Sequence, residues 1–133
     1  MRATLSSLMQ ELSLRSGPSA AAAARATLAT WFASRVSDPV LRDAQLIVSE
    51  VVGGAGSGEP RLQLKAGLDV EVLRVELQAP AQMSGSLRRV ARSRADGLFL
   101  AEALSSRWGI ELGATTRVWF EVAAREPQRS RAA

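Results

Sequence analysis

The sequence predicts a two-layer sandwich of the α/β (α+β) class, in which helices pack on one face of a mixed, mostly antiparallel sheet. Alternation of apolar and polar residues recurs late in the chain, in Val70–Gln78 and in Thr116–Val122, and such alternation indicates strands with one buried face. Apolar residues at helical spacing come earlier, in two adjacent segments. Because short turns join the later strands, antiparallel pairing with helices on one side is the natural architecture.

Met9–Leu14 is predicted to form a short strand, and a helix follows it. Gly17–Pro18 separates the two, because both residue types terminate regular structure. The helix is predicted over 19–36 with Ser19 as its N-cap. Its apolar positions recur at helical spacing and turn the aromatic pair Trp31–Phe32 towards the core.

A second helix is predicted to begin at Asp38–Pro39, since aspartate can accept a bond from a free amide and proline tolerates the first helical position. It is expected to stop at the glycine-rich run Gly53–Gly58, which resists helix formation. That run also suggests a phosphate-binding loop. It lacks the Gly-Lys-Ser/Thr ending of such loops, so a helix-terminating linker is the favoured interpretation.

The second half of the chain is predicted to hold two half-buried strands, Arg61–Lys65 and Val70–Gln78, joined by a turn at Gly67. A long loop then runs over 79–95, and loops of this length in compact domains are often lids or binding segments.

A third helix is predicted over 96–107, with its apolar side made by Leu100, Ala103 and Leu104. The strands Ile110–Leu112 and Thr116–Val122 complete the order. Alternation places Trp119 on the face opposite Val118 and Phe120, where an exposed indole would mark an interface.

The length of 133 residues fits one domain, predicted over 1–124, followed by a disordered basic tail over 125–133. The chain has no histidine and no cysteine, which excludes serine–histidine triads, ordinary zinc sites and disulfides. It has neither an apolar run long enough to span a membrane nor the apolar segment of a secretory signal. We therefore expect a cytoplasmic protein without a membrane partner.

Five short motifs in order carry a family resemblance, and they cover the chain from about Met9 to Val122. They are Val48–Val52, Leu73–Leu77, Gly97–Leu104, Arg107–Gly109 and Val118–Glu121. In this order and spacing the chain resembles the GHKL, or histidine-kinase-like, ATPase domain of anti-sigma-factor serine kinases. The resemblance implies a Bergerat-type ATPase fold and a role in bacterial sigma-factor signalling.

The resemblance also implies where magnesium and a catalytic base would lie. Family members carry a Ser-Glu-Leu-Val-Thr-Asn-Ala run whose glutamate acts on the nucleophile and whose asparagine binds magnesium. Ser49–Val52 matches this run, so Glu50 is the candidate, vestigial general base. Gly54 stands at the asparagine position, and glycine offers no side-chain oxygen to a cation that prefers oxygen ligands. No metal site is expected.

Two further nucleotide-pocket positions depart from the family pattern. Ala79 stands where the resemblance places the aspartate that accepts the adenine amino group. The Gly-Arg-Gly-Leu motif keeps only Gly97 and Leu98, and Asp96 precedes them where phosphates would arrive. A carboxylate there repels a triphosphate. No ATP or magnesium cofactor is therefore expected.

Three hypotheses for the function follow. The leading one is a degenerate, non-catalytic relative that regulates by binding a protein, such as a sigma factor or an anti-sigma antagonist, and that can form homodimers. The second is an active serine kinase with a non-standard ATP pocket. The third is a basic nucleic-acid-binding protein, since the net charge is +4 and arginine binds phosphates well. The arginines in question are Arg88, Arg89, Arg92 and Arg94. No aromatic residue interleaves with them, so a protein partner is favoured over nucleic acid.

Overall fold

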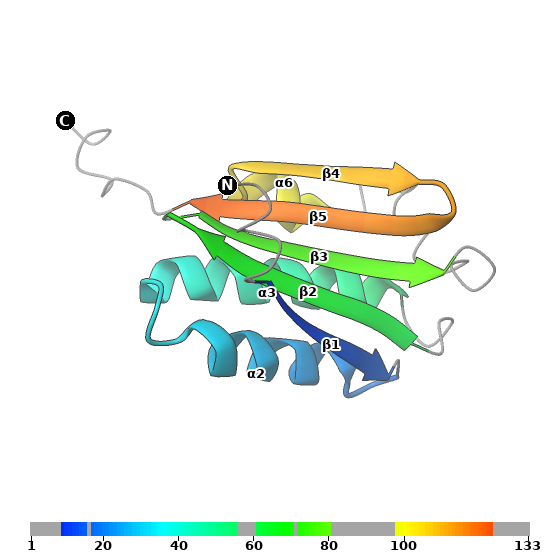
Figure 1. Cartoon of the computed structure of the whole chain (residues 1–133), viewed down its shortest axis with the longest axis horizontal. Coiled ribbons are helices and arrows are strands. Elements are labelled where there is room, and N and C mark those ends of the chain that lie inside the picture. The colour runs from blue at the N-terminus through cyan, green and yellow to red at the C-terminus, as the bar shows by residue number, and fades with distance from the viewer. Residues whose placement is uncertain (1–8, 16, 56–60, 71, 81–97, 124–133) are drawn as a thin grey trace.

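The computed structural model describes residues 9–15, 17–55, 61–70, 72–80 and 98–123. Its elements in chain order are β1 (Gln10–Arg15), α2 (Ala20–Phe32), α3 (Asp38–Ala55), β2 (Arg61–Asp69), β3 (Val72–Pro80), α6 (Phe99–Leu104), β4 (Arg107–Leu112) and β5 (Thr115–Ala123). The five strands in these ranges form one sheet of order β1-β2-β3-β5-β4, and every neighbouring pair is antiparallel. The helices pack on one face of this sheet (Figure 1). The predicted fold class is confirmed.

The core lies between the sheet and α3, because alternation turns one set of strand side chains towards the helices. On β5 these buried residues are Thr116, Val118, Phe120 and Val122, and on β3 they are Leu73, Val75, Leu77 and Ala79. The facing residues of α3 recur at helical spacing and are Ala44, Ile47, Val48 and Val51. The alternation seen in the sequence therefore marks the sheet face that the helices cover.

The start of α3 differs from the prediction in its capping residue. The hydroxyl of Ser37 accepts a hydrogen bond from the backbone N–H of Val40 at 3.4 Å, and the carbonyl of Ser37 accepts one from Leu41. Asp38 already lies inside the first turn, where a carboxylate interacts favourably with the positive end of the helix dipole. The assignment of Asp38 as the cap is wrong by one residue.

The ends of the first two helices also differ from the prediction. Helix α2 ends at Phe32 rather than near Val36, with Phe32 buried and Trp31 packed edge-on against its ring. Helix α3 continues through Gly53 to Ala55. A glycine in a helix costs roughly 1 kcal/mol, and packing of the buried Val51–Val52 pair just before it offsets that cost.

The turn between β2 and β3 lies beyond Gly67, which contradicts the prediction. Gly67 pairs with Arg74 inside the sheet, and a Cβ there would come within 2.8 Å of the side chain of Met9. The glycine thus permits a close approach instead of making a turn. At the tip of the hairpin, Val70 adopts φ 60° with its side chain 88% exposed. This left-handed conformation costs a β-branched residue about 1–2 kcal/mol.

The third helix, α6, is shorter than the predicted 96–107. Ser105 has an extended backbone, and Arg107 already pairs with Glu121 in the sheet, so strand pairing outweighs helix continuation. Ala101 is the buried alanine of this helix, whereas Ala103 is exposed, which corrects the predicted apolar side.

Some predictions fall outside the described residues: the segment with Arg88, Arg89, Arg92 and Arg94, and the tail over 125–133. Within the described ranges, no helix has the length and apolar character that crossing a membrane requires.

Candidate functional site

Glu50 lies on α3, and its half-buried carboxylate reaches the first turn of α6. Its Oε1 atom accepts a hydrogen bond from the backbone N–H of Leu100 at 2.7 Å. Leu98 is the N-cap of α6 and makes no side-chain cap bond, so the amide of Leu100 would otherwise lack a partner. A carboxylate at a helix N-terminus is stabilising. Glu50 therefore links α3 to α6.

Of the other predicted nucleotide-pocket positions, some lie in the described part of the chain and some do not. Leu98 is buried in the core at 1% exposure, and Gly54 lies in the last turn of α3, one turn after Glu50. Asp96 and Gly97 lie outside the described residues. The structure therefore brings Glu50 and Leu98 together at the start of α6, and it leaves the expected phosphate-facing position of Asp96 a prediction.

Ala79 lies near the end of β3 with its methyl group buried at 1% exposure. It pairs with Thr116 of β5, and β4 contributes Leu112 on the other side of Thr116. The Oγ1 atom of Thr116 is buried and has no hydrogen-bond partner among the described residues. A buried unpaired hydroxyl is unusual in native proteins.

Thr116 is a residue that sequence reasoning assigned only to a strand. The signal was present, because a threonine occupies an inward position in an alternating run whose other inward residues are Val118, Phe120 and Val122. A hydroxyl at a buried position normally forms a hydrogen bond, so this threonine could have been singled out from the sequence. Thr116 lies directly beside Ala79 in the sheet, so a methyl group and a hydroxyl without a partner among the described residues are neighbours there.

The expectation that this chain binds no magnesium stays a prediction. Magnesium prefers several oxygen ligands, yet no three acidic side chains gather in the described part of the chain. Gly54 has no side-chain oxygen, and the nearest predicted carboxylate, Glu50, already accepts the Leu100 amide.

The opposite face of the sheet carries a network of ion pairs around Trp119. Arg74 pairs with Glu76 and with Glu121, each at 2.9 Å. The guanidinium of Arg74 lies 4.3 Å from the centre of the Trp119 ring, and that of Arg107 lies 5.5 Å from it. Trp119 does lie opposite Val118 and Phe120 as predicted, but it is half-buried beneath these arginines.

Arg117 extends this network across β4 and β3. It donates hydrogen bonds to Glu111 and to Glu76. Burial lowers the pKa of Arg117, but these hydrogen bonds and the two negative charges outweigh burial, so its pKa is raised above the ordinary value. Arg117 therefore links β5 to Glu111 of β4 and to Glu76 of β3.

The comparisons with known proteins find similarity in structure and none in sequence. No family model matches the chain, and no curated protein matches it by sequence. A crystal structure of the RsbU and RsbW domains of Rv1364c from Mycobacterium tuberculosis is similar, with a TM-score of 0.62 and 22% sequence identity. The match covers 88% of this chain and 33% of that one, so the chain spans about a third of its neighbour's length. The two proteins share a fold.

Proposed function

We propose that this chain is a degenerate relative of anti-sigma-factor kinases, which has lost ATP and magnesium binding and regulates bacterial partner-switching by contacting other proteins. The observation that carries the proposal is Ala79. Its methyl group is buried, and the sequence resemblance places the base-recognising aspartate of the family at this position. A methyl cannot accept the adenine amino group, and an unpaired polar group in a buried pocket costs about 1–3 kcal/mol.

The state of Glu50 supports the same proposal. A general base must be free to accept a proton from a hydroxyl held within hydrogen-bond reach. Here the Oε1 atom of Glu50 accepts the Leu100 amide at 2.7 Å. The carboxylate thus caps the first turn of α6, a role that needs no nucleotide.

The structural neighbour supports the proposed partner class. It contains an RsbW domain, and RsbW is an anti-sigma-factor kinase of this fold. Partner-switching regulators of this kind act through protein contacts, so a sigma factor or an anti-sigma antagonist is the proposed partner. Homodimer formation and a cytoplasmic location belong to the same proposal.

An active kinase with a non-standard pocket is the second candidate, and Thr116 is the observation that favours it. Its buried Oγ1 atom has no partner among the described residues and lies beside Ala79. A hydroxyl can both donate and accept a hydrogen bond, so Thr116 could bind a base without the aspartate. For the nucleic-acid hypothesis, the proposed arginines lie outside the described residues, and no observation favours it.

Isothermal calorimetry with ATP and ADP, with and without magnesium, separates the first two candidates. A family kinase with an intact pocket serves as the positive control. We expect no binding heat from the native chain. The triple variant Gly54→Asn/Ala79→Asp/Asp96→Arg restores the two oxygen-bearing side chains, removes the carboxylate that repels the triphosphate, and should bind ATP measurably. Micromolar binding by the native chain would overturn the proposal and make Glu50→Ala kinase assays the next step.

The partner class has its own test. The purified chain is mixed with each sigma factor and each anti-sigma antagonist of its source organism, and complexes are resolved by size-exclusion chromatography with light scattering. We expect one complex of defined stoichiometry that forms equally with and without ATP. If complex formation requires ATP, the protein is a conventional member of the family.

A further inference from the structure

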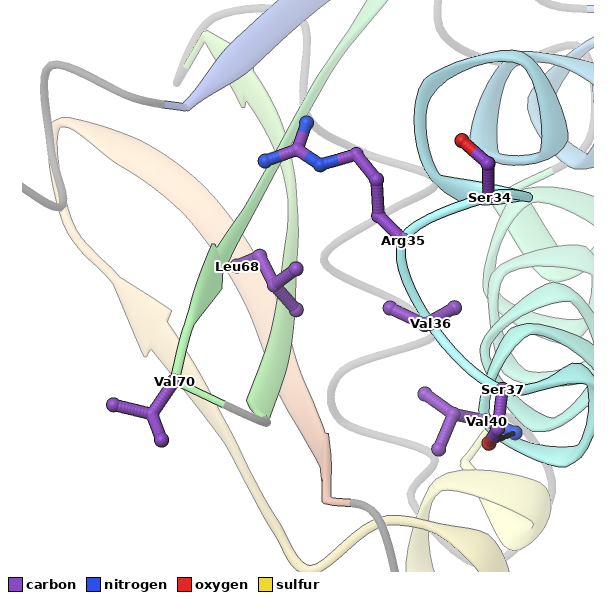
Figure 2. A pocket seen from close by; sticks show the side chains of 7 residues that line it. All are labelled: Ser34, Arg35, Val36, Ser37, Val40, Leu68 and Val70. Carbon is purple, nitrogen blue, oxygen red and sulfur yellow. Dashed lines mark hydrogen bonds between the residues drawn. The ribbon is translucent and has the colours of Figure 1, made fainter.

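A pocket of about 410 Å³ lies at the end of the sandwich where α2 turns into α3. Val36 and Val40 line it from the helical side, and Leu68 lines it from β2 (Figure 2). Arg35 and Val70 stand on opposite sides of its rim. This is the hairpin end of β3, whereas Ala79 lies at the other end of the same strand (Figure 1). The pocket is therefore separate from the nucleotide positions.

The pocket combines an aliphatic lining with one positive charge. Val40 is buried, and Leu68 and Val36 are half-buried against the core. Arg35 is exposed, its guanidinium carbon lies 5.4 Å from the Phe32 ring centre, and it forms no ion pair with any described residue. In Figure 2 its side chain extends from the turn towards the strands.

Among the described residues, no carboxylate next to the pocket pairs with Arg35. Asp38 and Asp69 neighbour lining residues in sequence, but neither lines the pocket or pairs with Arg35. Asp38 lies in the first turn of α3, where it faces the positive end of that helix. An anion in the pocket would thus meet a guanidinium that pairs with no described carboxylate, and arginine can bind a carboxylate through two parallel hydrogen bonds.

Val70 provides a second, independent observation. It is an aliphatic, β-branched residue held at φ 60° with its side chain 88% exposed at the pocket rim. Valine rarely adopts this conformation, and backbone strain of this kind concentrates at binding sites. An exposed apolar side chain beside a half-open pocket gains contacts only when something binds there.

We propose that this pocket binds a segment of a partner protein that presents an aliphatic side chain next to a carboxylate. The aliphatic group would lie against Val36, Val40 and Leu68 under Val70, and the carboxylate would pair with Arg35. The pocket volume is in the range that holds a few side chains. This proposal goes beyond the proposed function, since it holds whether or not ATP binding is lost.

The test uses the full chain labelled with ¹⁵N and three capped tetrapeptides followed by NMR. The probe is acetyl-Ala-Leu-Glu-Ala-amide, and the two controls replace its glutamate by lysine or its leucine by alanine. We expect saturable shifts at millimolar probe, confined to the amides of Val36, Ser37, Leu68 and Val70. Removing the leucine should weaken binding roughly tenfold or more, and the lysine peptide should bind at least roughly threefold more weakly than the probe, because it loses the pair with Arg35 and adds a like charge.

Variants of the protein make the test specific. Arg35→Gln should weaken probe binding by roughly threefold, since exposed ion pairs contribute modestly. Arg42→Gln, an exposed arginine on α3 outside the pocket, should leave it unchanged. Spectra with native dispersion show that both variants fold. Equal shifts with the lysine peptide, no shifts at all, or tighter binding of free octanoate than of the peptide would each overturn the proposal.

Discussion

Replacing Thr116 by valine should stabilise the protein. The side chain of Thr116 is fully buried, and its Oγ1 atom has no partner among the described residues. Its neighbours across the sheet, Ala79 and Leu112, are apolar. Valine has nearly the same shape and keeps the β-branch that suits a strand. It removes the desolvation cost of the unpaired hydroxyl, so the free energy of unfolding should rise by about 1–3 kcal/mol.

Urea denaturation measures this change, and an unchanged m-value shows that the two states being compared are the same. Thr115→Val is the matched control, because Thr115 is exposed and adjacent in the same strand. Its effect should stay within about 0.5 kcal/mol. A loss of stability of about 1 kcal/mol or more in Thr116→Val would refute the reasoning, because it would mean that the hydroxyl makes a bond in the native protein.

Three further substitutions test other features. Glu50→Ala should lower the free energy of unfolding by about 1–2 kcal/mol, because it removes the acceptor for the Leu100 amide. Hydrogen exchange of that amide should also become faster. Unchanged exchange at Leu100 would show that Glu50 does not cap α6. Val70→Asn should raise the free energy of unfolding by about 1 kcal/mol, since asparagine tolerates positive φ. A lower urea concentration at the unfolding midpoint would show that Val70 is not strained. Gly109→Ala should lower the free energy of unfolding by about 1–3 kcal/mol, because its Cβ would come within 2.7 Å of the Trp119 ring. Tryptophan emission should change as the ring moves, and an unaltered emission spectrum would contradict the predicted clash.

The architecture is predictable from the sequence because apolar residues recur along the chain at the spacing of strands and of helices. Alternation in β3 and β5 fixes which residues face the helices, and Phe120 at the centre of β5 is fully buried. The spacing of Ile47, Val48 and Val51 fixes the buried side of α3 in the same way. These patterns arise from burial along one continuous face, so they are visible in local sequence.

Features that depend on contacts between residues far apart in the chain are not predictable from local sequence. Local sequence places a turn at Gly67, but this glycine admits the side chain of Met9, which lies just before β1 and far away in the chain. Val70, the residue that does turn, is among the least suited to positive φ. The bond from the Leu100 amide to Glu50 spans 50 positions, and no local pattern encodes it.

Thr116 offers a single substitution that bears on both candidate functions. If ATP binding is lost, the hydroxyl beside Ala79 only costs folding energy, and valine at this position raises stability without changing any interaction with nucleotide. If the pocket is a working, non-standard one, the hydroxyl is a binding group, and Thr116→Val must weaken ATP binding whatever it does to stability. Stability and calorimetry on the same variant thus answer different questions. A stabilised variant with unchanged partner binding is the combination that the protein-interaction proposal requires.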